Sequence, residues 1–195
     1  MVTQNLETKI RQKRLSPEQR REQLLACAIM SYADLGVMRA GHGDVAKCAG
    51  VSTATVFNYF PTREALTQAV FQEVYNVFDR MFDAFPIRPE HTGSLGFLSA
   101  AYEFLVAEHP DVAKVVLNWS ASFSDEVRPA FLKFQSWVLS GIHTRLEPPR
   151  ENMSDARIIM ASAYQYARMK LDGTDQAVLD RFTARVMSAL SLDEN

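Results

Sequence analysis

Side chains that can hydrogen-bond to nucleic acid gather in one short segment near the N-terminus. Residues 52–60, STATVFNYF, combine hydroxyl, amide and aromatic side chains. An asparagine amide can pair bidentately with adenine, hydroxyls can reach phosphates, and an aromatic ring can contact a thymine methyl group. On a helix, Val56 and Phe60 would share the inner face. The outer face would then carry the candidate contact residues Thr53, Thr55, Phe57, Asn58 and Tyr59.

The elements around this segment are arranged as a helix-turn-helix motif requires. A short helix is expected over 44–49, a Gly-Val-Ser turn follows, and Ser52 caps a second helix over 53–60 that Pro61 ends. The free N–H groups at the Ser52 end can receive a phosphate. The two short helices therefore form a candidate helix-turn-helix unit.

A basic segment precedes this unit. Lys9-Ile10-Arg11-Gln12-Lys13-Arg14 has no periodic apolar face, and Arg11, Lys13 and Arg14 can enter an A·T-rich minor groove. Residues 1–63 carry nine Lys or Arg and five Asp or Glu, a net charge of +4, whereas the rest carries −6. This asymmetry favours contact of the N-terminal part of the chain with a polyanion such as DNA. For the basic segment itself, the alternative is a solvated tail that only improves solubility.

The turn-forming residues and helix caps of the sequence predict an all-α fold. Gly and Pro are 16 of 195 residues, and no segment alternates as a strand would. Helices are expected at about 17–35, 44–49, 53–60, 62–82, 93–108, 111–121, 125–146, 155–170 and 175–191, with Ser16, Ser124 and Ser154 as N-caps. The expected organisation is a flexible basic arm over 1–15, a DNA-binding domain over 16–62 and a helical ligand-binding and dimerisation domain over 63–195.

Several other classes of protein are disfavoured. No apolar run is long enough for a membrane span and no h-region follows the basic start, so a cytoplasmic location without membrane contact is expected. Cys27 and Cys48 have no histidine at a motif-like spacing and are expected to pack in helix cores. Glu108, His109 and Asp111 would point apart at a helix end, with His109 as a C-terminal helix charge. We therefore expect no catalytic residues, no metal and no cofactor.

Several stretches of the sequence carry a resemblance to a known family. Residues 43–66, GDVAKCAGVSTATVFNYFPTREAL, resemble the DNA-binding signature of the TetR family of repressors. Residues 39–44 (RAGHGD), 54–64 (ATVFNYFPTRE), 119–122 (WSAS) and 125–127 (DEV) resemble the LuxR/HapR/SmcR group of quorum-sensing master regulators. The resemblance implies an all-helical fold whose three-helix head binds DNA and whose C-terminal bundle dimerises and often holds an effector. It also implies roles in DNA binding for Gly41 and Phe57, and a phosphate contact for Arg63.

The same resemblance implies an effector pocket and a dimer in the C-terminal part. Five residues match positions that line an apolar pocket in the group, with one polar group among them: Phe78, Met81, Val116, Trp119 and Gln135. Ordinary core packing is the alternative for these positions. The family pairs its last two helices with those of a second copy. Here those helices would use Ala156, Ile159, Met160, Ala163 and Ala167 with Val178, Phe182, Val186, Ala189 and Leu190, unless these faces are buried within one chain.

The predicted function is a dimeric, sequence-specific, DNA-binding transcriptional regulator of TetR type, with a double-stranded DNA operator and a possible small apolar effector as partners. Within that class, the resemblance implies a quorum-sensing master regulator. Two alternatives stay open. One is a TetR-type repressor of another pathway, such as efflux or metabolism. The other is a helical protein-binding adaptor, which a steep salt dependence of polyanion binding would exclude.

Overall fold

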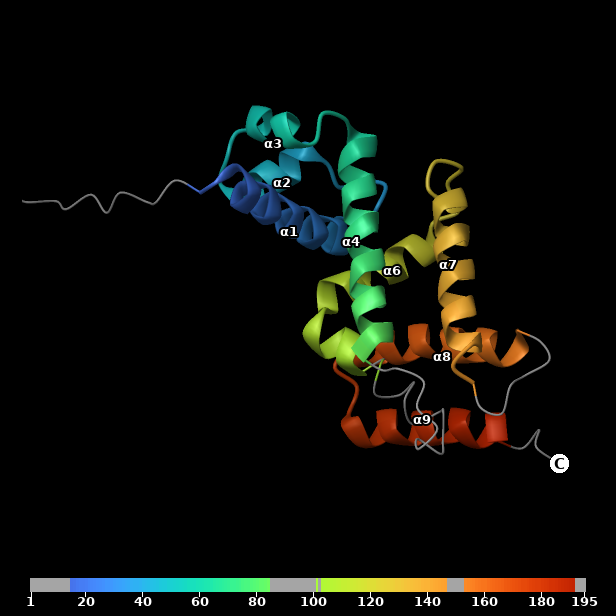
Figure 1. Cartoon of the computed structure of the whole chain (residues 1–195). Helices are drawn as coiled ribbons and strands as arrows, with labels where there is room; N and C mark the ends of the chain where they lie inside the picture. The colour runs from blue at the N-terminus through green and yellow to red at the C-terminus, as the bar shows by residue number, and fades with distance from the viewer. Residues whose placement is uncertain (1–14, 85–100, 102, 147–152, 192–195) are drawn as a thin grey trace, which may run out of the picture.

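The chain forms a small helical head on a larger helical body, with no strand among the described residues. The computed structural model describes residues 15–84, 101, 103–146 and 153–191. The helices are α1 (Pro17–Leu35), α2 (His42–Ala49), α3 (Thr53–Tyr59), α4 (Arg63–Ala84), α6 (Pro110–Ala121), α7 (Arg128–His143), α8 (Ser154–Leu171) and α9 (Gln176–Ser191). Residues 103–108 are also helical. The prediction of an all-α fold is confirmed (Figure 1).

The first helix begins and ends where its sequence signals stand. The Ser16 hydroxyl accepts from the Gln19 N–H at 3.1 Å, and the Gln19 side chain accepts from the Ser16 N–H at 3.0 Å. This capping box satisfies donors that the first turn leaves unpaired, and Pro17 follows it without losing a helical bond. At the other end Gly36 adopts a φ of 83°, which side-chain-bearing residues rarely adopt.

In the head, α2 packs against α1 and α3 packs against α2. Gly50 turns the chain between them in the left-handed conformation, with a φ of 65°, and Ser52 caps α3. Val56 and Phe60 are buried, as their positions on the inner face predict. The helix-turn-helix unit expected from the sequence is thus present (Figure 1).

Helix α4 runs from the head into the body and connects the two (Figure 1). Near its start, the Thr67 hydroxyl lies 2.7 Å from the hydroxyl of Tyr32 on α1. A second connection comes from α6, where the Asn118 amide donates to the Ala33 carbonyl at 2.9 Å. The head is therefore held to the body through both α4 and α6.

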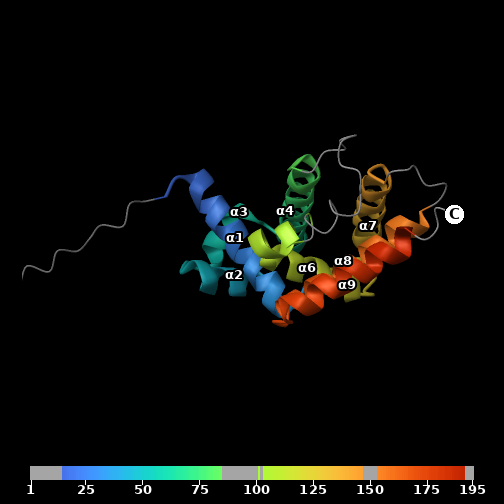
Figure 2. The same ribbon diagram turned by 90° about the horizontal axis from the view of Figure 1, so that it is seen from below.

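The body is built on an aromatic cluster between α4, α6 and α7. Trp119 is fully buried, and its ring stacks on Phe71 with centroids 3.7 Å apart. The rings of Phe131 and Phe134 lie 5.6 and 5.3 Å from it. Figures 1 and 2 show α8 and α9 side by side at the far end from the head.

Some local predictions were wrong. Helix α7 begins at Arg128 instead of 125 and is capped by Val127, because the Ser124 hydroxyl and carbonyl close a turn to Glu126 and Arg128. Met153 rather than Ser154 precedes α8 as the cap residue. His109 is the cap residue of α6 and also ends the helical residues 103–108, where its N–H donates to the Leu105 carbonyl at 3.0 Å, so its predicted place at a helix C-terminus is confirmed.

Two burial predictions also need correction. Cys27 is buried as expected, but Cys48 is exposed, although its thiol lies close enough to the Cys27 thiol of α1 to help raise the pKa of Cys27. The small-residue face of α8 is not available for a second copy. Ala156 and Ile159 are core residues, and Met160, Ala163 and Ala167 face an internal cavity, because α8 lies across the ends of the body helices. The arm at 1–14 and most of the helix predicted at 93–108 lie outside the described residues.

Candidate nucleic-acid interface and internal cavity

The outer face of α3 presents hydrogen-bonding side chains to solvent. Thr53 and Asn58 are exposed, and Tyr59 is half-buried. The Ser52 hydroxyl accepts from the Thr55 N–H at 3.2 Å and lies 2.9 Å from the Thr55 hydroxyl, so these two residues also cap the helix. Of the predicted residues of α3, Thr53, Phe57 and Asn58 are therefore exposed, whereas Thr55 and Tyr59 are half-buried.

Phe57 is held in place by a histidine that the sequence did not single out. Its ring is 46% exposed and stacks on His42, with centroids 3.9 Å apart and planes 10° from parallel. His42 is buried, and its Nε2 lies 2.7 Å from the Phe60 carbonyl. A carbonyl can only accept, so Nε2 carries the proton. His42 of α2 thus contacts both Phe57 of α3 and the backbone of Phe60, which follows α3. In the sequence, only its place between two glycines, Gly41 and Gly43, set it apart.

Gly41 precedes α2, and nothing in the fold requires a glycine there. Its φ of −160° is extended backbone that any residue adopts, and a Cβ at this position would meet no atom within 4 Å. Its N–H donates to the Asp44 carboxylate at 3.0 Å. The space beside Gly41 is therefore open, and the role in DNA binding that the resemblance implies stays a prediction.

Arg63, predicted as a phosphate contact, hydrogen-bonds within the head. Its Nη2 donates to the Met38 carbonyl and, at 3.4 Å, to the Val37 carbonyl. These carbonyls belong to the turn between α1 and α2, a few residues before Gly41. Arg63 therefore ties the start of α4 to that turn.

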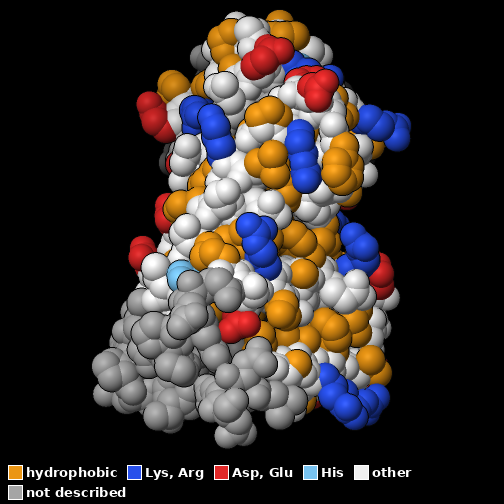
Figure 3. Space-filling model, turned by 90° about the vertical axis from the view of Figure 1, so that its right-hand side faces the viewer, with side chains coloured by type: hydrophobic (Ala, Val, Ile, Leu, Met, Phe, Trp, Pro, Cys, Tyr) orange, Lys and Arg blue, Asp and Glu red, His pale blue; other side chains and the backbone are white. Residues whose placement is uncertain are grey.

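The Lys and Arg side chains of the described residues can be followed on one side of the molecule. On the face shown in Figure 3, Lys and Arg side chains lie apart from one another and do not form one patch. The basic residues Arg11, Lys13 and Arg14 fall outside the described residues, so their contact with DNA stays a prediction.

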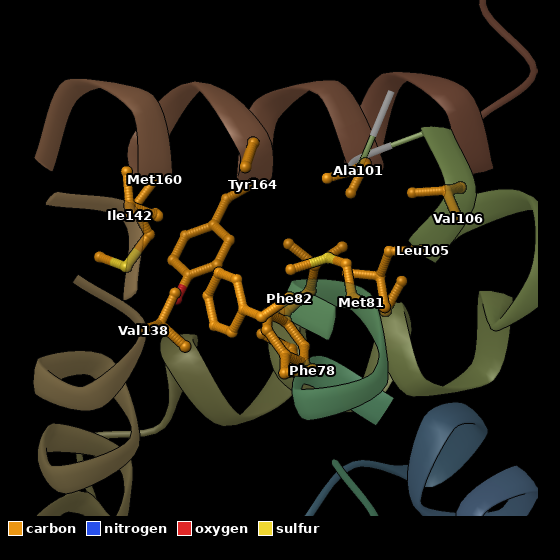
Figure 4. A pocket seen from close by; sticks show the side chains of 15 residues that line it. Phe78, Met81, Phe82, Ala101, Leu105, Val106, Val138, Ile142, Met160 and Tyr164 are labelled. Carbon is orange, nitrogen blue, oxygen red and sulfur yellow. The ribbon is translucent and has the colours of Figure 1, made fainter. Parts of the chain in front are cut away.

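A second feature is an apolar cavity inside the body. It has a volume of about 40 Å³ and lies between α4, α6, α7, α8 and the residues Ala101, Leu105 and Val106 (Figure 4). Its walls include Phe82, Leu105, Val138, Ile142 and Met160. No Lys, Arg, Asp or Glu is among the described residues that line it. Such walls suit an uncharged, apolar molecule.

The structure brings three of the five predicted pocket residues to this cavity. Phe78 and Met81 of α4 and Val116 of α6 line it. Trp119 and Gln135 do not. Trp119 is core, with its indole N–H donating to the Val127 carbonyl at 3.2 Å. Gln135 is half-buried on α7 and is not among the side chains that line the cavity, so it does not supply the polar group expected of it.

The polar group of the cavity is Tyr164, which sequence reasoning missed. Its hydroxyl is buried and has no hydrogen-bond partner in the part of the chain that the structure describes. Burial raises the pKa of this phenol to about 12, so the hydroxyl keeps its proton at neutral pH. Helical periodicity places Tyr164 on α8 but carries no sign that its hydroxyl lacks a partner.

The described residues contain neither a metal-binding cluster nor a membrane-spanning helix. No group of His, Cys, Asp and Glu there is arranged to hold a metal ion. None of the described helices combines the length and apolar character needed to cross a membrane.

Comparison with known proteins relates the chain to bacterial regulators. No family model matches it. Over 120 residues it is 40% identical to the HTH-type transcriptional regulator LuxR of Vibrio harveyi, and the match covers 61% of this chain and 58% of LuxR. The match therefore spans less than two thirds of that relative.

Solved structures share the fold at low sequence identity. A TetR-like transcriptional regulator from Rhodococcus sp. RHA1 has a TM-score of 0.70 at 17% identity, and the match covers 93% of this chain and 100% of that one. The TetR family regulator CifR, as a cysteine mutant with 26 bp operator DNA, has a TM-score of 0.70 at 13% identity, with coverages of 86% and 95%. FadR of Bacillus subtilis, with stearoyl-CoA, has a TM-score of 0.64 at 19% identity, with coverages of 87% and 96%. The resemblance predicted from the sequence is confirmed.

Proposed function

We propose that this chain, a homologue of LuxR with the fold of the TetR-like regulators, is a dimeric transcriptional regulator that binds a specific DNA operator. The observation that carries the proposal is the outer face of α3, where Thr53 and Asn58 are exposed on a helix-turn-helix unit. Such a helix lies in the major groove and reads base edges. The operator-bound CifR structure, which shares the fold, supports this use of the head.

The residues of the head divide between reading bases and fixing position. Asn58 is the proposed base-reading residue, because an amide can bond adenine at two atoms. Phe57, held by His42, is placed to contact a thymine methyl group. Ser52, Thr53, Thr55 and Tyr59 are proposed to bond phosphates, which orients the head without reading sequence.

The dimer would use the outward faces of α8 and α9. The inward face of α8 is occupied by the core and the cavity, whereas Ile158 is 47% exposed and Ala161 and Gln165 share its side of the helix. On α9, Val178 is 38% exposed. A two-fold pairing of these faces would present two heads to successive major grooves, roughly 34 Å apart.

Binding of an effector in the cavity can affect the position of the head through two helices. Helix α4 lines the cavity with Phe78 and begins directly after α3. Helix α6 lines it with Leu117, and the next residue, Asn118, bonds the Ala33 carbonyl of the head. A ligand that moves either helix would change the spacing of the heads, provided that it binds the two spacings unequally.

A role in quorum sensing rests on the likeness to LuxR. It predicts that occupancy of the chain's own operators in cells changes with cell density. Genome-wide footprints of the protein taken at low and at high density test this, and identical footprints would favour a regulator of another pathway.

Selection of bound duplexes from a random pool tests the DNA-binding proposal. We expect a two-fold symmetric motif and an affinity that falls steeply with salt. Deleting residues 1–14 removes Lys9, Arg11, Lys13 and Arg14 and should make the log–log salt slope shallower by roughly 0.9 for each phosphate that these side chains neutralise. Failure to enrich any motif, with salt-independent retention of protein partners, would favour the adaptor instead.

A further inference from the structure

The cavity in the body holds one polar atom that the fold leaves without a partner. Figure 4 shows the Tyr164 ring reaching from α8 across the cavity, with its oxygen on the side of Val138. The hydroxyl is buried and unpaired among the described residues. Buried polar groups are nearly always hydrogen-bonded, so an orphaned hydroxyl in an otherwise apolar wall requires an explanation.

Water is poorly suited to be that partner. The volume of about 40 Å³ exceeds the roughly 10 to 15 Å³ that one water needs. A buried water, however, needs two to four polar groups around it, and among the described lining residues only the Tyr164 side chain is polar. A molecule that is apolar except at one atom would match both the walls and the hydroxyl.

We propose that Tyr164 donates a hydrogen bond to a carbonyl-type oxygen of an uncharged, apolar effector that occupies this cavity. The proposal rests on the function proposed above and names the ligand class of the same site. Ionised ligand groups are disfavoured, because no charged side chain among the described lining residues could neutralise them. The phenol remains protonated at neutral pH because burial raises its pKa to about 12, which makes it a donor.

The walls can yield to a ligand larger than the present volume. Met81 and Met160 line the cavity from α4 and α8 (Figure 4). Methionine is flexible and adapts to irregular shapes, so these side chains can move aside without breaking a polar contact. A ligand seated there would press on α4, which leads back to the head.

The test uses acetophenone and ethylbenzene, which share a ring and a two-carbon chain and differ by one carbonyl oxygen. Each is titrated into full-length protein with 13C-labelled methionine methyl groups, and Met81 and Met160, assigned by substitution, report on the cavity. The variant Tyr164→Phe keeps the ring and removes only the hydroxyl. Tyr166→Phe is the matched control, since it makes the same change on the same helix at a residue that does not line the cavity.

We expect Tyr164→Phe to weaken acetophenone binding about three- to tenfold more than ethylbenzene binding, the size of one net hydrogen bond. For each compound we take the ratio of the dissociation constant of the variant to that of the wild type, so that the different solubilities of the compounds cancel. Tyr166→Phe should alter neither ratio. Because the hydroxyl has no partner among the described residues, Tyr164→Phe should also unfold at the same temperature as the wild type or higher.

Three results would overturn the proposal. One is an equal effect of Tyr164→Phe on both compounds. Another is a lower unfolding temperature for Tyr164→Phe, which would show that the fold itself pairs the hydroxyl. The third is the absence of any shift at Met81 and Met160. Operator affinity with saturating acetophenone is measured separately: if acetophenone binds through Tyr164 while DNA affinity stays constant, the ligand class stands and the proposed regulation by effector fails.

Discussion

Replacing Arg63 by alanine should destabilise the head, and this is the sharpest test of how the DNA-binding surface is held. The guanidinium donates from Nη2 to the carbonyls of Val37 and Met38, which form the turn before Gly41. Hydrogen bonds from charged donors contribute about 1.5 to 3 kcal/mol when buried. Met38 is partly exposed and its bond is screened, so we expect a loss of about 1.5 to 3 kcal/mol for the pair together.

The measurement is urea unfolding of the full chain, with thermal unfolding beside it. For a chain of this length, a loss of that size lowers the melting temperature by about 3 to 12 °C. Arg39→Ala is the matched control, because it removes the same charge from an exposed side chain next to the same turn. We expect its stability to differ from that of the wild type by less than about 0.5 kcal/mol.

The variant Arg63→Lys separates the two roles of the side chain. Lysine keeps the charge that a phosphate contact needs but lacks the planar fork that reaches two carbonyls. We expect Arg63→Lys to lose stability and to keep the salt slope of DNA binding, and Arg63→Ala to lose both, with the slope shallower by roughly 0.9. Wild-type stability in Arg63→Ala would refute the reasoning from the turn.

Three further outcomes are expected at Asn58, Trp119 and Gly141. Asn58→Ala should cost roughly 1 to 3 kcal/mol on the selected operator and little on random duplex, measured by fluorescence anisotropy, and equal losses on both would remove Asn58 from base readout. Trp119→Phe should lower stability by about 2 to 4 kcal/mol, because it vacates buried space and leaves the Val127 carbonyl unpaired, yet it should leave the affinity for acetophenone unchanged; a large loss of that affinity would return Trp119 to the cavity wall. Gly141→Ala should cost about 1 to 3 kcal/mol, because a Cβ there would come within 2.7 Å of the Phe82 ring, and thermal unfolding at wild-type temperature would contradict that close packing.

The sequence by itself determined the elements of the head and its outer face. The cap at Ser16, the turn at Gly50 and the stop at Pro61 act on their immediate neighbours, so local rules place α1, α2 and α3 to within a few residues. Helical period then assigns Val56 inward and Asn58 outward, because a seven-residue helix has only one face to bury.

Only the tertiary structure decided which side chains meet across helices. The stack of His42 on Phe57 depends on how α2 meets α3, and the bonds of Arg63 depend on how α4 meets the turn after α1. The unpaired hydroxyl of Tyr164 depends on how α8 crosses the body helices. Periodicity puts Trp119 and Val116 on buried faces of α6 alike. The crossing of α6 with α4 and α7 places Trp119 in the aromatic core and Val116 at the cavity. A helix buried on several sides gives its apolar residues more than one possible neighbour.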